Sequence, residues 1–127
     1  AAEIPASKMH ASARGLATKM QLIASGQMGD GLEASGDARE QSWAERINGD
    51  DLVLPLHISW AAGLMRETGG LFGAPPTAIG HYGFGGSCVL ADPARSLSFA
   101  YVPNQQSHHL VSDPRAVRLV EAVYRAL

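Results

Sequence analysis

The segment HYGFGGSCVLADPARSLSFAYV, residues 81–102, predicts the central part of the fold. Its second part holds two β-prone runs, SCVLA and LSFAYV, which are separated by the polar link DPAR at residues 92–95. A proline within a short polar link between β-prone runs is a turn signal. We therefore expect an antiparallel hairpin over residues 86–103, with strands near 86–91 and 97–102.

The glycine-rich start of this segment, HYGFGGS at residues 81–87, allows two interpretations. A strand without side chains on one face lets a ligand approach closely, and its unpaired N–H groups can point at an oxyanion. A glycine bulge that bends a sheet is the simpler interpretation of the segment taken alone. An extended chain would hold His81 and Ser87 on one face but about 20 Å apart, so we expect no local His–Ser pair.

Two helices are predicted outside this segment. Residues 12–25 form the first, with Ser12 as N-cap and Gly26 just past the end. Its apolar residues recur at helical spacing: Leu16, Met20 and Ile23. The second helix, residues 114–126, follows Asp113 as N-cap and begins with a proline. Its expected buried side consists of Val117, Val120, Val123, Tyr124 and Leu127.

The region between the first helix and the hairpin gives weaker signals. Residues 26–51 are rich in Gly, Asp, Glu and Ser, and we expect a loop with one short helix near Trp43 and Ile47. Residues 57–66 favour a strand, because apolar residues alternate along it. The alternating residues are Ile58, Trp60, Ala62 and Leu64.

Composition limits the class of protein. The 127 residues are most simply one domain, and hydrophobic residues make up 46% of them, as in a globular chain. The formal charge is −2 and the ten Lys and Arg are scattered, which argues against a nucleic-acid binder. No apolar run approaches the roughly 20 residues of a membrane span. The N-terminal AAEIPASKMH lacks the pattern of a signal peptide.

The common motifs of nucleophiles and bound groups are missing from the sequence. No serine or threonine is followed by lysine three positions later, so there is no Ser-x-x-Lys. Ser87 lies in GGSCV, which fails the Gly-x-Ser-x-Gly elbow at its last position. GFGGS is neither a P-loop nor a dinucleotide fingerprint. We therefore expect no phosphate-binding or dinucleotide cofactor site.

The histidines and the single cysteine do not indicate a metal site. His10, His57, His81 and the pair His108-His109 have no ligand spacing. We expect His108 and His109 to be exposed loop residues. Cys88 cannot form an intramolecular disulfide, because it is the only cysteine, and we expect it to be a small buried hydrophobe.

Three separated segments resemble one family. GHYGFGGSCVLADPARSLSFAYVPNQ resembles the C-terminal strands of the serine β-lactamase-related hydrolases, which include class C β-lactamases, family VIII carboxylesterases and DD-peptidase relatives. In many members a His-x-Gly replaces the Lys-Thr-Gly box. IPASKMHASARGLATKM and SDPRAVRLVEAVYRAL resemble the helices on either side. The resemblance covers nearly the whole chain, in order, and is weakest over residues 27–56.

The resemblance implies a set of site residues. His81-Tyr82-Gly83 matches the box, with His81 facing the substrate cleft and helping the electrostatics around the nucleophile, Tyr82 in the middle and Gly83 keeping the cleft edge open. Phe84 follows the box, where the family's backbone N–H gives one of two oxyanion-hole donors. Esterase members often carry Trp there, so Phe84 is a mild departure.

The resemblance also implies a fold, and it shows that two catalytic motifs of the family are missing from this sequence. The fold is α+β, with N- and C-terminal helices packed on an antiparallel sheet, as in the C-terminal portion of the β-lactamase/transpeptidase-like fold. The family's Ser-x-x-Lys and Tyr-x-Asn lie upstream of the first helix, and neither occurs here. We therefore expect residues 1–127 to be one C-terminal domain of a longer hydrolase, inactive alone and without cofactor. The alternative is a non-catalytic binding or interaction module.

Partners follow from the same resemblance. The complete enzyme would act on a small-molecule ester or β-lactam. An exposed sheet edge beside Leu16, Met20 and Trp60 would favour self-pairing. We expect a homodimer, or association with the missing N-terminal part.

Overall fold

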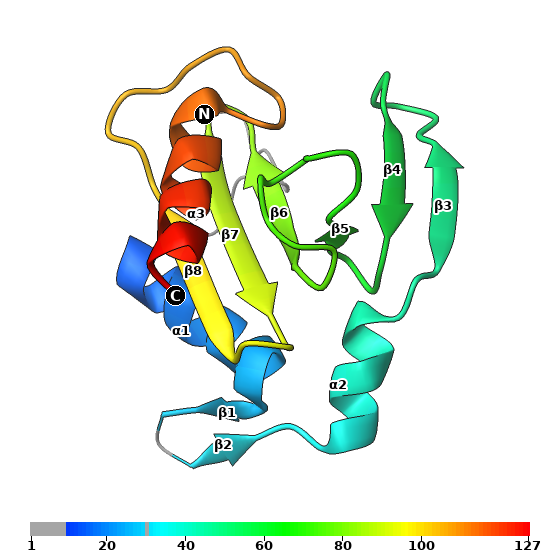
Figure 1. Cartoon of the computed structure of the whole chain (residues 1–127), viewed down its shortest axis with the longest axis vertical. Coiled ribbons are helices and arrows are strands. Elements are labelled where there is room, and N and C mark those ends of the chain that lie inside the picture. The colour runs from blue at the N-terminus through cyan, green and yellow to red at the C-terminus, as the bar shows by residue number, and fades with distance from the viewer. Residues whose placement is uncertain (1–9, 30) are drawn as a thin grey trace, which may run out of the picture.

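The computed structural model describes residues 10–29 and 31–127. The first residues, where the sequence predicts no signal peptide, lie largely outside this range. Two helices, α1 (Ala13–Ser25) and α3 (Pro114–Ala126), lie on opposite faces of a sheet (Figure 1). The chain is therefore an α+β domain, as the sequence predicts, and the two helices and the sheet form three layers.

The main sheet has six strands in the order β3-β4-β5-β6-β7-β8, and every neighbouring pair is antiparallel. The strands are β3 (Ile47–Asp50), β4 (His57–Trp60), β5 (Met65–Arg66), β6 (Ile79–Gly83), β7 (Ser87–Asp92) and β8 (Leu97–Tyr101). A separate pair, β1 (Gln27–Met28) and β2 (Leu32–Glu33), follows α1 and precedes the short helix α2 (Gly36–Trp43).

The predicted hairpin of β7 and β8 is confirmed, with its turn held by a buried carboxylate. Asp92 is fully buried. One of its oxygens accepts a hydrogen bond from the Ala94 N–H at 3.1 Å, and the other accepts from Arg95 and from the Tyr124 hydroxyl at 2.9 Å each. The turn thus connects the sheet to α3 as well as joining its two strands.

Both predicted helices are present with the expected caps. The Ser12 hydroxyl accepts from the Gly15 N–H at 3.2 Å, and Gly26 ends α1 at φ 83°, where glycine is favoured. Asp113 accepts from the Arg115 N–H at the start of α3. Leu127 is an exception to the predicted buried side. It is 75% exposed, because α3 ends at Ala126 and the last residue no longer packs on the sheet.

The predicted strand over residues 57–66 is confirmed only at its two ends, because the range holds two antiparallel strands, β4 and β5, and not one continuous strand. The chain reverses after β4 in a turn around Gly63, which has φ 77°, and the Ala61 N–H bonds to the Leu64 carbonyl at 2.7 Å. Ala62 therefore lies exposed in the turn instead of continuing an apolar face. The predicted short helix is α2, which ends at Trp43, whereas Ile47 lies in β3.

Two apolar clusters occupy the two faces of the sheet. Met20 and Ala24 of α1 pack with Ile79 and Ala91 on one face. The opposite face carries the larger cluster, Ile58, Met65, Phe72, Ala78, Tyr82, Cys88, Leu90, Ala116 and Val120. Because side chains alternate along a strand, His81, Gly83 and Ser87 share the α1 face with Ile79 and Ala91. Met20 is buried in its cluster, so its side chain is not part of an exposed apolar surface.

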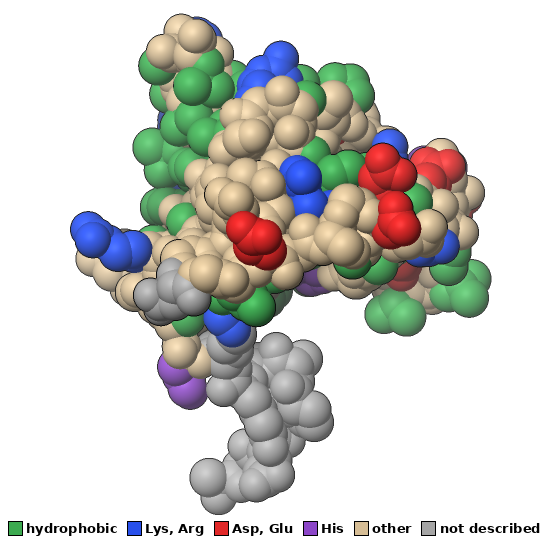
Figure 2. Space-filling model, turned by 90° about the horizontal axis from the view of Figure 1, so that it is seen from below, with side chains coloured by type: hydrophobic (Ala, Val, Ile, Leu, Met, Phe, Trp, Pro, Cys, Tyr) green, Lys and Arg blue, Asp and Glu red, His purple; other side chains and the backbone are tan. Residues whose placement is uncertain are grey.

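The face shown in Figure 2 carries no large basic patch, because its Lys and Arg side chains lie apart from one another. None of the helices in residues 10–29 and 31–127 has the length and apolar character needed to cross a membrane.

Candidate functional site

The predicted His-x-Gly box lies on β6 where that strand has one free edge. β5 pairs only with Ile79 and Gly80, whereas β7 runs beside all of β6. Within the described part of the chain, no strand pairs with the outer edge of His81, Tyr82 and Gly83. The main chain of the box is therefore open on the side away from β7.

The His81 side chain is exposed on the α1 face, and its tautomer follows from one contact. Nδ1 lies 2.6 Å from the Tyr82 carbonyl oxygen, which can only accept a hydrogen bond. Nδ1 must therefore carry the proton, and in the neutral ring Nε2 is left as an acceptor. The Trp60 ring lies 5.8 Å away between centroids and flanks the imidazole.

Tyr82, the middle residue of the box, points to the other face. Its hydroxyl donates to the Leu71 carbonyl at 2.9 Å, and its ring stacks on Phe72 at 4.9 Å. Burial raises the pKa of this phenol far above its ordinary value. The side chain anchors β6 to residues 71–72 and does not face the same side as His81.

The glycines after the box form a tight turn, so the expected strand or bulge at 83–86 is wrong. The Gly86 N–H bonds to the Gly83 carbonyl at 3.1 Å, and Gly85 and Gly86 have φ of 98° and 104°. These left-handed positions favour glycine. Phe84 occupies the tip and is 67% exposed. Its N–H makes no hydrogen bond to any described residue.

The turn changes the relation between His81 and Ser87. Ser87 pairs with Gly83 across the hairpin, while His81 pairs with Val89. His81 and Ser87 are therefore diagonal neighbours on one face, about 7–8 Å apart, and the expected separation of 20 Å is wrong. The Ser87 hydroxyl has no hydrogen-bond partner in residues 10–29 and 31–127.

The turn is held from outside by the segment before α3. The Gly85 carbonyl accepts from the Ser107 N–H at 3.0 Å and from the Arg115 guanidinium at 3.1 Å, while the Gly85 N–H donates to the His109 carbonyl at 3.2 Å. His109 is half-buried and its ring stacks on the exposed His108. The expectation that both histidines are exposed therefore holds for His108 only.

Asp113 is the centre of this anchor. It is 1% exposed and accepts hydrogen bonds from Ser107 at 2.6 Å and from Arg115 at 2.8 to 3.0 Å. The Arg115 guanidinium, with help from the Ser107 hydroxyl and the Arg115 N–H, holds the pKa of Asp113 well below its ordinary value. A Cβ at Gly86 would lie 2.2 Å from the carboxylate. The sequence indicates Asp113 only as a helix cap and gives no sign of this contact with the turn.

Two neighbouring cavities flank the turn. One of about 370 Å³ is lined by His81, Gly83, Ser87 and Val89 among others, and one of about 360 Å³ by Phe84, Gly85 and Gln106 among others. Both include Ala11, Ser87 and Val102. Neither is lined by Lys or Arg among the described residues.

Other reactive groups are not placed for chemistry here. Cys88 is buried, as predicted, and burial raises the pKa of its thiol to about 12. In the described part of the chain, no three His, Cys, Asp or Glu side chains are grouped to hold a metal ion. The groups that this site offers are therefore the His81 imidazole, the Phe84 N–H and the Ser87 hydroxyl.

Comparisons with known proteins agree on one family. The family model described as Beta-lactamase matches residues 1–122. A penicillin-binding protein homolog from Caulobacter crescentus has 45% identity and a TM-score of 0.86, over 92% of this chain and 32% of that one. A family VIII carboxylesterase has 33% identity and a TM-score of 0.85, over 91% and 32%.

A third structure is EstA from Arthrobacter nitroguajacolicus Rue61a, with 26% identity and a TM-score of 0.77 over 91% of this chain and 32% of that one. A comparison with curated protein sequences gave no match. The chain thus spans about a third of the length of the structures that it resembles.

Proposed function

Because the chain belongs to the beta-lactamase family, we propose that it supplies one wall of the acyl-transfer site of a β-lactamase-related serine hydrolase. This wall consists of the His81-Tyr82-Gly83 strand and the Phe84 N–H. The reaction is the transfer of an acyl group from an ester or a β-lactam to a serine, followed by hydrolysis.

The observation that carries the proposal is the unused N–H of Phe84. It lies at the tip of an anchored turn, directly after a strand edge that is open on the side away from β7. A preorganised N–H stabilises the oxyanion of an acyl-transfer transition state, and its loss typically costs about 3 kcal/mol. The bonds that hold Gly85 fix this donor before a substrate arrives.

His81 and Ser87 complete the wall. Nε2 of His81 is free to accept a proton or hydrogen bond, because Nδ1 is occupied by the Tyr82 carbonyl.

The nucleophile is proposed to come from another segment. No serine or threonine of the 127 residues is followed by lysine three positions later. Ser87 lies near His81, but leucine and not lysine stands three positions after it, so we expect it not to act as the nucleophile. The chain alone should therefore leave p-nitrophenyl esters and nitrocefin unhydrolysed and should not react with a fluorophosphonate probe.

Complementation tests the proposal. The chain is co-refolded with the part of the Caulobacter penicillin-binding protein homolog that it does not cover, and hydrolysis of p-nitrophenyl butyrate is measured. We expect activity in the mixture and in neither part. The Ser87→Ala variant should retain this activity. If a fluorophosphonate probe labels the chain alone and does not label Ser87→Ala, the proposal is contradicted.

Phe84→Pro gives a sharper variant. Proline removes the N–H but suits the second position of this turn, and Gly83 before it is already extended. We expect about a 100-fold to 1000-fold loss of kcat in the complemented enzyme. Phe84→Ala keeps the N–H and should retain most activity. Association of the two parts without any activity would favour the alternative, a non-catalytic binding or interaction module.

We also propose that the outer edge of β8 is a place of association. β8 is the last strand of the sheet and, in the described residues, no strand pairs with its outer edge. An open edge pairs with another strand, from a second copy or from the rest of a longer hydrolase. Sedimentation should show concentration-dependent dimers of the chain alone. A monomer across a wide concentration range would contradict self-pairing.

A further inference from the structure

A third hollow lies on the α1 face, away from the His81 cavities. It has a volume of about 310 Å³ and shares no lining residue with the two cavities beside the turn. Ile79 lines it, two residues before His81 on the same face of β6. The volume is at the lower end of the range for small-molecule sites, about 300 to 1000 Å³.

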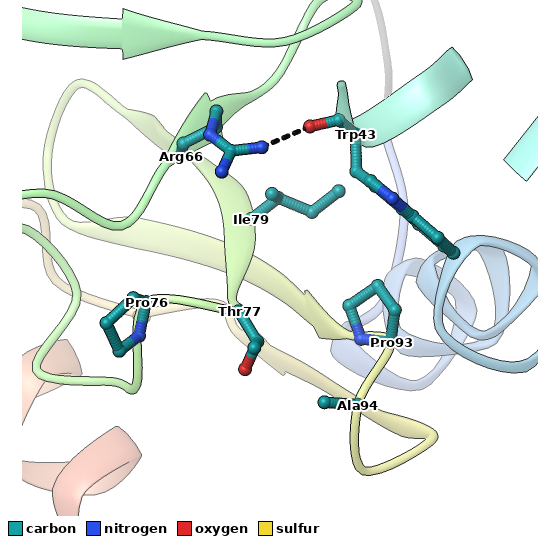
Figure 3. Close-up of a pocket in the computed structure, with 7 residues that line it drawn as sticks. All are labelled: Trp43, Arg66, Pro76, Thr77, Ile79, Pro93 and Ala94. Atoms are coloured by element: carbon teal, nitrogen blue, oxygen red, sulfur yellow. Dashed lines mark hydrogen bonds between the residues drawn. The ribbon is translucent and has the colours of Figure 1, made fainter. Parts of the chain in front are cut away.

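The walls of this pocket are apolar. Figure 3 shows Trp43 and Ile79 on one side and Pro76 and Pro93 along the other. The Trp43 ring is held by Arg39, whose guanidinium carbon lies 5.3 Å from the ring centroid. The prolines and the packed ring make these walls stiff, so an apolar group can bind them with little loss of side-chain freedom.

Among the described residues that line the pocket, Arg66 carries the one charged side chain, Thr77 carries a hydroxyl, and none is acidic. Arg66 pairs with Ile79 across the sheet and donates one guanidinium N–H to the Trp43 carbonyl (Figure 3). This bond orients the group, and its other N–H donors have no partner among the described residues. The Thr77 hydroxyl accepts from Arg95 at 3.4 Å and points away from Arg66 (Figure 3).

We propose that this pocket binds a small amphipathic carboxylate. Its apolar tail lies against Trp43 and Ile79, and its carboxylate accepts from Arg66. An oriented guanidinium matches a carboxylate with two parallel hydrogen bonds, and an apolar pocket with few polar groups strengthens them. The site is independent of the acyl-transfer proposal, because it uses none of the same residues.

Octanoate is the probe, and octanamide is its neutral counterpart of the same length. Each is titrated at neutral pH into the ¹⁵N-labelled chain while the indole N–H signals of Trp43 and Trp60 are followed. Octanoate should shift Trp43 saturably and leave Trp60 in place. The affinity for octanamide should be lower by about tenfold or more, which is the loss expected when a charge-assisted hydrogen bond is removed. Equal binding of the two, or no saturable shift at Trp43, overturns the proposal.

Two variants test the residues. Arg66→Gln should weaken octanoate binding about tenfold or more, whereas Arg118→Gln on the exposed side of α3 should leave it unchanged. Ala94→Phe, at an exposed turn position beside the pocket, should block binding by filling the hollow without touching Arg66. Unchanged affinity in either pocket variant overturns the proposal. If the NMR spectrum of Arg66→Gln shows that this variant is unfolded, octanoate binding by Ala94→Phe tests the proposal instead.

Discussion

The two ends of the sheet differ in how they are covered. β6, β7 and β8 lie between α1 and α3 (Figure 1). Leu90 of β7 is completely buried. The β3–β4 ribbon lies to one side, and Leu52 and Val53 in its connection are 101% and 87% exposed. Apolar burial is the main favourable term in folding. The difference teaches that most of the favourable free energy of folding comes from the helix-covered half, to which the ribbon adds mainly through Ile58.

The ribbon is anchored by Ile58 of β4, which is fully buried in the larger cluster, and it also makes polar contacts at the surface. His57 lies 3.0 Å from an Asp50 oxygen and 2.9 Å from the Asn48 side-chain oxygen. The Trp60 indole N–H donates to Asp51 at 3.1 Å. Exposed ion pairs contribute about 0 to 1 kcal/mol, so these contacts orient the ribbon more than they stabilise the domain.

Truncation of one leucine in each half should give the largest contrast. Leu90→Ala should lower the free energy of unfolding by about 3 kcal/mol, because it leaves a cavity between the sheet and α3. Leu52→Ala should change it by less than about 0.5 kcal/mol. Urea denaturation followed by circular dichroism measures both. Similar losses for the two would mean that Leu52 is buried in solution and that the comparison fails.

Two glycines give the next contrast. Gly86→Ala places a Cβ against Asp113 and Arg115 at φ 104°, and should lower the free energy of unfolding by about 2 kcal/mol. Gly49→Ala in β3 meets nothing within 4 Å and should be neutral or slightly stabilising. Thermal unfolding of the pair is the measurement. A neutral Gly86→Ala would show that the turn is not clamped as described.

Two aspartates give the smallest contrast and add a pH dependence. Asp113→Asn should cost about 1 to 2 kcal/mol, whereas Asp50→Asn, at a 92% exposed side chain, should cost less than about 0.5 kcal/mol. Because hydrogen bonds from Arg115 lower the pKa of folded Asp113, its contribution is present above the unfolded pKa of about 3.9 and is lost as pH falls below it.

The measurement is urea denaturation of the native protein and both variants from pH 7 to pH 3. The difference between the native protein and Asp113→Asn should be largest at neutral pH and should shrink below about pH 4. A difference that stays constant over this range would mean that Asp113 titrates normally in the folded chain.

The covered half could be predicted well from sequence because its signals are local. The link at residues 92–95 indicated the β7–β8 turn, and Ser12, Gly26 and Asp113 indicated the helix ends. The ribbon was predicted less well. Ala61 to Leu64 continue an alternating pattern although the chain turns there, and only Gly63 in the sequence signals the reversal.

In the candidate site, too, one part could be predicted from the sequence and another could not. The resemblance to a family located the His81 box, and the comparisons show the same family. The sequence could not show that Gly85 and Gly86 turn the chain back toward His81. That turn depends on Asp113 and Arg115, which lie almost thirty positions later, and such a contact leaves no local pattern.

The alternation of side chains along β6 has a consequence for protein engineering. His81 and Tyr82 are adjacent in sequence, yet one is exposed beside a cavity and the other fixes Leu71 and Phe72 beneath the sheet. A library that randomises all three box positions together would mostly sample unfolded proteins. Variation at 81 and 84 with Tyr82 retained would change the chemistry of the pocket while the scaffold stays intact.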